Sequence, residues 1–80
     1  MYDWKLVTLT RMRPGESGVV AQFRGGRGVA NRLSALGIVP GKRVTKVSSM
    51  FMRGPVTIEV DRVQIAIGFG MANKVIVDLG

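Results

Sequence analysis

The sequence contains no cysteine and no histidine among its 80 residues. Without thiols the chain cannot form disulfides, zinc fingers or iron–sulfur ligation, and it cannot use thiol catalysis. Without imidazole, every mechanism that needs this group at neutral pH is excluded, including the histidine-dependent serine hydrolases. Acidic residues are also scarce, with five Asp and Glu in the whole chain. A reducing cytoplasm fits this composition.

The chain also lacks a hydrophobic segment long enough to cross a membrane. Its longest uncharged stretch, Val63 to Asn73, has 11 residues, whereas a spanning helix needs about 20. The first residues, Met1 to Lys5, lack the charged-then-apolar pattern of a signal peptide. The sequence therefore predicts a cytoplasmic protein without membrane insertion.

Positive charge is what the chain has in excess. Twelve Lys and Arg against five acidic residues give a net charge of +7. The basic residues are spread out with no run of three, which is typical of a charged folded surface rather than a polybasic tail. Such a surface attracts nucleic acid, anionic lipid or an acidic protein. A chain this short closes one hydrophobic core, so we expect a single domain over residues 1–80.

The stretch from Arg24 to Lys42 predicts a loop, a short helix and a turn. Three apolar side chains at i, i+4 and i+7 form one face of about two helical turns: Val29, Leu33 and Leu36. We expect Gly37 to end the helix in a left-handed conformation, which lets Ile38 fold back onto its last turn. Pro40–Gly41 then suits a type II turn.

Short stretches of alternating polarity predict strands in much of the rest of the chain. The five predicted strands are Ser17–Arg24, Arg43–Ser49, Pro55–Asp61, Val63–Phe69 and Val75–Leu79. Asp61 and Arg62 are expected to form the turn of a hairpin, and Gly70–Asn73 a single 3₁₀ turn. These elements predict a mainly β fold, a small SH3-like five-stranded barrel with one short α-helix between the first two strands.

The first twelve residues show no clear strand period. We expect Leu6 and Leu9 to contribute to the core and Trp4 to cover one end of the barrel. Arg13–Glu16 is predicted to be a turn, since it contains a Pro-Gly pair. In the first predicted strand, Val19, Ala21 and Phe23 share one face, and Val20 and Gln22 share the other: this is the period of a regular strand.

Three glycines before the helix, next to Arg24 and Arg27, are compatible with a phosphate site. Free amides at a helix start and nearby guanidinium groups attract anions. The glycines are Gly25, Gly26 and Gly28. The Walker pattern is absent, however, because Gly37 to Lys42 has three residues between its glycines and is followed by Arg43. We therefore interpret the glycines as turn residues, and no cofactor is predicted.

Neither a metal site nor a catalytic site is predicted. Glu59 and Asp61 share a strand face, but nearby Arg53 and Arg62 favour a solvated sheet face with ion pairs. Three lysines were the remaining candidates for an activated amine: Lys42, Lys46 and Lys74. Each is predicted at a turn or strand end, where a solvated charge is expected. The sequence thus indicates no enzyme.

The motif Arg32-Leu33-x-x-Leu36-Gly37-x-x-Pro40-Gly41 is the most specific feature of the chain. Further positions that fit the same pattern are Leu9, Pro14–Gly15, Gly18, Gly54–Pro55, Ala66–Ile67, Met71–Ala72 and Val75. With these residues the chain resembles the FeoA family, small bacterial proteins with an SH3-like fold that accompany the ferrous iron transporter FeoB. The resemblance runs from about Leu6 to Val77, and Asp61–Arg62 departs from it where such proteins often carry a glycine turn.

The resemblance implies a cytoplasmic, non-catalytic accessory protein that binds the nucleotide-binding part of FeoB and assists iron uptake. Two segments are predicted to bind this partner. The first is the basic side of the helix: Arg24, Arg27, Asn31 and Arg32. The second is an apolar loop tip with an arginine: Met50, Phe51, Met52 and Arg53. The loop could instead pack on its own barrel, the helix face could simply be solvated, and a homo-oligomer contact could use the same residues.

Two other functions are compatible with the sequence. A small basic nucleic-acid-binding barrel fits the net charge of +7, but the five aromatic residues are scattered, with Phe23 and Phe69 on core-facing positions. A similar domain forms the carboxy-terminal part of iron-dependent repressors. That function needs an upstream DNA-binding helix pair, for which a chain beginning at Met1 is not expected to have room.

Overall fold

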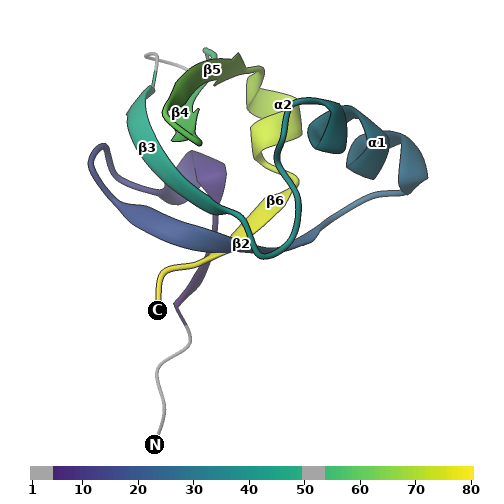
Figure 1. Ribbon diagram of the computed structural model, residues 1–80, viewed down its shortest axis with the longest axis horizontal. Helices are drawn as coiled ribbons and strands as arrows, with labels where there is room; N and C mark the ends of the chain where they lie inside the picture. Colours follow the sequence, from purple (N-terminus) through teal and green to yellow (C-terminus); the bar gives the residue numbers. More distant parts are fainter. Residues whose placement is uncertain (1–4, 50–53) are drawn as a thin grey trace, which may run out of the picture.

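The computed structural model describes residues 5–49 and 54–80. The predicted position of Trp4 over one end of the barrel and the predicted partner-binding segment Met50–Arg53 therefore lie outside the described residues. Within these ranges, six strands form one antiparallel sheet in the order β1-β6-β2-β3-β4-β5 (Figure 1). The strands are β1 Leu6–Thr8, β2 Ser17–Phe23, β3 Arg43–Ser49, β4 Val56–Val60, β5 Val63–Ile67 and β6 Val75–Asp78. The helices are α1 Arg27–Ala35, α2 Phe69–Ala72 and the 3₁₀ helix η1 Leu9–Arg11.

The mainly β class and the helix between β2 and β3 are confirmed, but three elements differ from the prediction: β1, α2 and η1, which was not predicted. The sheet has a sixth strand, β1, which is too short to show a period and forms because Val7 pairs with Val77 of β6. The predicted 3₁₀ turn at Gly70–Asn73 is instead the α-helix α2, which begins one residue earlier. None of the helices in the described ranges is long and apolar enough to cross a membrane.

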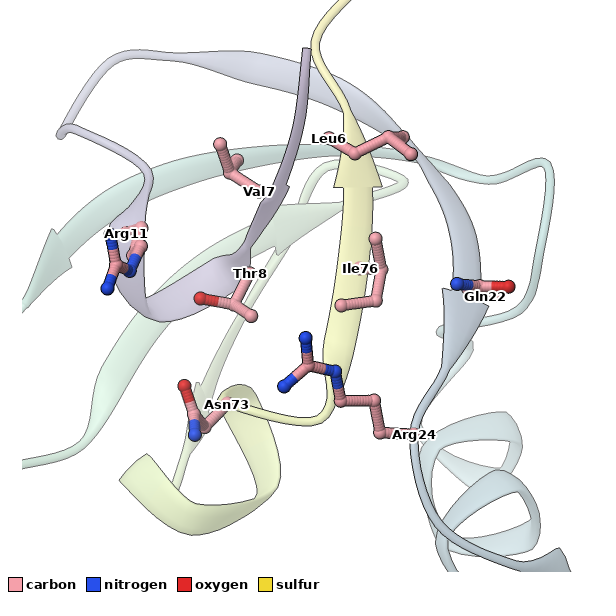
Figure 2. A pocket seen from close by; sticks show the side chains of 8 residues that line it. All are labelled: Leu6, Val7, Thr8, Arg11, Gln22, Arg24, Asn73 and Ile76. Carbon is pink, nitrogen blue, oxygen red and sulfur yellow. The ribbon is translucent and has the colours of Figure 1, made fainter. Parts of the chain in front are cut away.

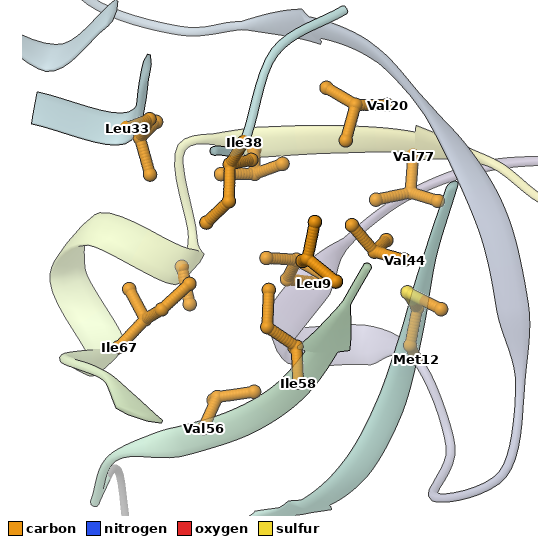
Figure 3. Close-up of a cluster of buried hydrophobic side chains, with 13 residues drawn as sticks. Leu9, Met12, Val20, Leu33, Ile38, Val44, Val56, Ile58, Ile67 and Val77 are labelled. Atoms are coloured by element: carbon orange, nitrogen blue, oxygen red, sulfur yellow. The ribbon is translucent and has the colours of Figure 1, made fainter. Parts of the chain in front are cut away.

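One cluster of buried apolar side chains fills the inside of the curled sheet (Figure 3). Every strand except β1 contributes a fully or nearly fully buried residue, as do α1, α2 and η1. The cluster consists of Leu9, Met12, Val20, Leu33, Ile38, Val44, Val56, Ile58, Val60, Ile67, Ala72, Val75 and Val77. The predicted core positions of Leu9 and of the helix residue Leu33 are thus confirmed, and the alternate residues of β4, Val56, Ile58 and Val60, all belong to the cluster.

Two residues predicted to be in the core are exposed. Leu6 is 43% exposed, because the side chain of β1 that packs against the core is its neighbour Val7. Leu36 is 45% exposed, because the helix ends at the preceding residue and Leu36 leaves the apolar stripe. Ile38 is fully buried and covers the end of the core in its place.

The helix end has the predicted geometry. Gly37 has φ +86°, and its N–H donates to the carbonyl of Ser34 at 2.9 Å. The N–H of Ile38 donates to the carbonyl of Leu33, also at 2.9 Å. This pair of bonds is the Schellman motif, which satisfies carbonyls that a helix end leaves without partners.

The β4–β5 hairpin closes with an unusual turn. Asp61 and Arg62 have φ of +51° and +69°, which are the two positive values of a type I′ turn. Glycine and asparagine are favoured there, since the left-handed region is costly for other residues. The predicted hairpin is confirmed, and its turn carries backbone strain.

We expect Arg62→Gly to raise the free energy of unfolding by about 0.5–1 kcal/mol, because glycine adopts φ of +69° without a clash. Urea unfolding followed by circular dichroism measures this change. Arg43→Gly is the control, since Arg43 lies within β3, where glycine weakens a strand. A lower stability of Arg62→Gly than of the wild type would contradict the strained turn.

A β-bulge at Ala21 changes the predicted faces of β2. The register with β6 shifts between Val20 and Gln22, so Ala21 is an extra residue in the strand. Val20 is 1% exposed and Ala21 is exposed, so the predicted grouping of Val19, Ala21 and Phe23 on one face is wrong. After the bulge, Phe23 returns to the side of Val20 and packs against the core. Such bulges bend a strand and help a short sheet to curl.

Candidate functional site

A groove of about 590 Å³ lies on the side of β1, β6 and β2 that faces away from the core (Figure 2). Its lining residues are Leu6, Val7, Thr8, Arg11, Gln22, Arg24, Asn73 and Ile76. Ile76 faces this side because Val75 and Val77, its neighbours along β6, are fully buried in the core. The groove therefore depends on the pairing of β6, near the end of the chain, with β1 and β2, near its beginning.

Aliphatic side chains form the floor of the groove. Ile76 is paired with Thr8 on β1 and with Gln22 on β2, and only 7% of it is exposed. Leu6, two residues before Thr8 on the same strand, is 43% exposed. The floor thus offers a small apolar contact surface between polar neighbours.

Two arginines stand at the groove and make no ion pair with another residue that the structure describes. Arg11 ends η1, and Arg24 follows β2; both are exposed. The backbone of Arg24 is fixed by its N–H, which donates to the carbonyl of Lys74 at 2.7 Å. Figure 2 shows the Arg24 side chain extending across β6 toward Thr8 and Asn73. Because no acidic residue is among the lining residues, this region is electropositive.

A chain of hydrogen bonds orients Asn73 at the groove. The hydroxyl of Thr10 donates to Asn73 Oδ1 at 2.9 Å, and the hydroxyl oxygens of Thr8 and Thr10 are 2.7 Å apart. A hydroxyl has one proton, so Thr8 donates to Thr10. The carbonyl oxygen of Asn73 is thereby occupied, and its two amide N–H bonds remain to donate. Together with Arg11 and Arg24, the groove presents mainly donors, which suits an anionic ligand.

Lys46 is a buried lysine that binds the backbone of η1, next to the groove. Its side chain is 1% exposed, and Nζ donates to the carbonyls of Leu9 at 2.8 Å and Thr10 at 3.2 Å. Burial lowers the pKa of Lys46 from its ordinary value, while the negative charge of Glu16 opposes this shift. Both acceptors belong to η1, so Lys46 anchors the helix that carries Arg11.

The prediction of a solvated Lys46 at a turn or strand end is wrong. Lys46 lies inside β3 and shares its inward face with Val44, because alternate residues of a strand point the same way. The register shift between Lys46 and Ser48 then places an extra residue, Val47, in β3. The alternation after Lys46 is therefore irregular.

The residues predicted to bind a partner fall into two adjoining groups. Arg24 lies in the groove with Arg11, whereas Arg27 and Asn31 project from α1 on the side opposite its buried Leu33. Arg32 is exposed as well, and its side chain makes no hydrogen bond or ion pair with another residue in the described ranges. We call the four predicted residues the basic face: Arg24, Arg27, Asn31 and Arg32. The structure does not describe Met50–Arg53.

Sequence reasoning missed seven of the eight lining residues, among them Arg11, Gln22, Asn73 and Ile76. Ile76 carried a signal, since β6 is apolar at three successive positions and cannot bury all of them on one face. The others carried none, because η1 and the bulge at Ala21 determine where they point.

The prediction that Glu59 and Asp61 share a strand face is wrong. Asp61 is in the turn after β4, not on the strand, and its Oδ2 accepts from Lys42 Nζ at 2.9 Å. Within residues 5–49 and 54–80, no three acidic side chains come together as a metal-ligand group.

A family model described as the FeoA domain matches residues 7–79. The chain belongs to the FeoA family. Its members act in ferrous iron transport. This assignment agrees with a crystal structure named as iron uptake regulatory protein (FeoA): the identity is 38%, the TM-score is 0.82, and the match covers 90% of this chain and 93% of that one. No curated protein matches the chain.

More distant structures share the SH3-like fold of this FeoA-family chain. A FeoA-like protein from Clostridium acetobutylicum has 16% identity and a TM-score of 0.82, over 94% of this chain and 87% of that one. A manganese-dependent transcriptional repressor has 17% identity and a TM-score of 0.86, over 100% of this chain and 45% of the repressor. The predicted SH3-like class is therefore confirmed.

Proposed function

We propose that this FeoA-family chain is a non-catalytic accessory protein of ferrous iron uptake. It works in the cytoplasm and binds the nucleotide-binding part of a FeoB-type transporter. Membership in the FeoA family supports a role in iron transport, and the 38% identical structure is named as an iron uptake regulatory protein.

The observation that carries this proposal is the uncommitted positive charge of the basic face. Within the described residues the one ion pair is Lys42–Asp61, although the chain has a net charge of +7. The cationic side chains of Arg24, Arg27 and Arg32 are exposed and unpaired in these ranges. An acidic protein surface is the complementary partner, and charge complementarity chiefly increases the rate and specificity of association.

The ionisable groups of the molecule support a binding role rather than catalysis. The charged side chains of the groove are arginines, which stay protonated and do not act as general bases. The buried amine of Lys46 is committed to two carbonyl oxygens. Arg27, Asn31 and Arg32 on the exposed side of α1 offer donors for an interface, and arginine is enriched in such contacts.

We expect Arg27→Glu combined with Arg32→Glu to weaken binding to the purified cytoplasmic domain of the transporter about tenfold or more at low salt. Two positive charges become negative without loss of a buried side chain, since both residues are exposed. Biolayer interferometry measures the affinity. Wild-type binding should also weaken as salt is raised, because exposed charges are screened.

Arg62→Glu is the matched control, since it reverses an exposed charge at the β4–β5 hairpin, outside the basic face. It should bind the domain nearly as the wild type does. Absence of wild-type binding at low salt would contradict the proposed partner. Equal losses in Arg62→Glu and in the α1 variant would contradict the proposed surface. The predicted contribution of Met50–Arg53 is part of the same proposal.

A further inference from the structure

We infer that the groove outside β1, β6 and β2 binds an extended acidic peptide segment, with one carboxylate held by Arg11 and another by Arg24. The inference rests on the proposed function, in that the segment belongs to the protein partner. It adds a site that lies beside α1 and that uses residues from both ends of the chain. The groove, of about 590 Å³, has room for a few residues of an extended chain.

Charge complementarity selects an acidic occupant. Arg11 follows β1 and Arg24 follows β2, the two strands that flank β6, and the Arg24 side chain reaches across β6 toward Thr8 and Asn73 (Figure 2). Neither arginine makes an ion pair with another described residue. The amide N–H groups of Asn73 add donors, since its oxygen is held by Thr10. The acid nearest along β6 is Asp78, which lies outside the lining and accepts a hydrogen bond from the N–H of Gly80 at 2.9 Å. Carboxylates in the groove therefore gain cationic partners in Arg11 and Arg24.

The apolar floor specifies the spacing of the peptide. Ile76 and the exposed Leu6 offer an aliphatic surface between the polar groups. In an extended peptide, alternate side chains point to the same side. A segment with acidic, aliphatic and acidic side chains at alternate positions places the aliphatic one on Ile76 and a carboxylate near each arginine. The amide of Gln22 can pair with the peptide backbone.

The wall of the groove is fixed before a ligand binds. Lys46 Nζ holds two carbonyls of η1, and the Thr8–Thr10–Asn73 hydrogen bonds join η1 to the residue after α2. Arg24 is tethered through its backbone to Lys74. A preorganised site loses less conformational entropy on binding, which favours a short linear ligand.

A peptide fits the groove better than single-stranded nucleic acid does. Nucleic-acid grooves of this kind combine positive charge with aromatic side chains on which bases stack. Among the residues that the structure describes, those that line the groove include no aromatic side chain. The groove lining is therefore short of the stacking surface that bases require.

The test is an NMR titration of the full ¹⁵N-labelled chain with the capped peptide Glu-Ser-Leu-Ser-Glu. We expect amide shifts at Thr8, Arg11, Gln22, Arg24 and Asn73. Arg11→Gln combined with Arg24→Gln should weaken peptide binding about tenfold, since two charge-assisted contacts are removed. Arg62→Gln is the control for loss of one exposed charge and should bind as the wild type does. The capped peptide Gln-Ser-Leu-Ser-Gln should not bind measurably.

Shifts confined to other parts of the chain, or equal binding of the two peptides, would overturn the inference. So would a single-stranded oligonucleotide that binds the groove more tightly than the acidic peptide. The Arg11 and Arg24 double variant is also measured against the transporter domain. If this variant binds the domain normally while the α1 variant does not, the groove inference fails and the proposed partner stands. If the domain does not bind but the peptide shifts the groove residues, the proposed partner fails and the groove site stands.

Discussion

Lys46→Ala is expected to lower the free energy of unfolding by about 3 kcal/mol, because it leaves a cavity and removes two charge-assisted hydrogen bonds. The side chain is 1% exposed, so water does not replace the lost donor without rearrangement. The carbonyl of Leu9 still accepts the N–H of Met12 at 3.3 Å, whereas Thr10 loses the Lys46 donor. Urea unfolding of the variant and the wild type measures the difference.

Lys46→Met is the matched variant, because methionine fills most of the same volume without the ammonium group. We expect its free energy of unfolding to be only about 1 kcal/mol below that of the wild type. The loss of the two hydrogen bonds is partly offset, because methionine avoids the desolvation cost of a buried charge. A Lys46→Ala variant within 0.5 kcal/mol of the wild type would contradict the anchoring role, as would a methionine variant that is as unstable as the alanine variant.

The pH dependence of stability provides a second measurement on Lys46. Burial lowers its pKa in the folded chain below the ordinary value of 10.5. Between the lowered pKa and 10.5, the unfolded chain holds more protons, so the free energy of unfolding rises with pH. We expect this rise in the wild type and not in Lys46→Met. Parallel pH profiles of the two proteins would contradict a pKa shift in the folded chain.

Gly18→Ala is expected to lower the free energy of unfolding by about 3 kcal/mol, because β2 and β6 leave no room for a methyl group. A Cβ on Gly18 would lie 2.5 Å from Val77 Cγ1 and 2.7 Å from the carbonyl oxygen of Asp78. The second atom belongs to the backbone of β6, so the strands must separate to relieve the contact. For a domain of this size, the melting temperature should fall by about 12–24 °C.

Gly28→Ala is the control for Gly18→Ala, since it makes the same substitution at a glycine with free space around it. Gly28 lies within α1, and a Cβ there would meet no atom within 4 Å. Alanine favours helix over glycine by about 1 kcal/mol, so this variant should be as stable as the wild type or more stable. Calorimetry distinguishes the two variants. A melting temperature of Gly18→Ala within about 3 °C of the wild type would show that β2 and β6 can separate at little cost.

The parts of the fold that the sequence predicted are those whose cause is local. The end of α1 follows from Gly37 alone, since one residue with positive φ allows the Schellman bonds. β4 follows from its regular alternation, with Val56, Ile58 and Val60 all buried as expected. The Asp61–Arg62 turn was found from the two strands beside it, although neither residue favours its conformation.

The parts that the sequence did not predict depend on distant residues. β1 has three residues and exists because β6, about 70 residues later in the chain, pairs with it. The bulge at Ala21 reverses the faces of β2 and has no signature in the residue types. Lys46 was predicted to be solvated because it was assigned to a turn or strand end, and its acceptors belong to η1, which was not predicted.

The candidate site was predicted only in part for the same reason. Arg24 was singled out for its charge, and the structure places it in the groove. Arg11 and Asn73 join it through the β1–β6 pairing and the bond from Thr10, which connect residues far apart in the chain. Arg27, which was also singled out, is exposed at the start of α1. A protein partner with an acidic surface is complementary to both.

The most direct test is to add the unlabelled cytoplasmic domain of a FeoB-type transporter to the ¹⁵N-labelled chain at low salt. We predict that amide signals of Arg24, Arg27 and the groove residues shift or broaden, while those of the Asp61–Arg62 hairpin do not change. The effects should decrease as salt is raised. Unchanged spectra at low salt, or changes confined to the β4–β5 hairpin, would contradict a basic face that docks on the transporter.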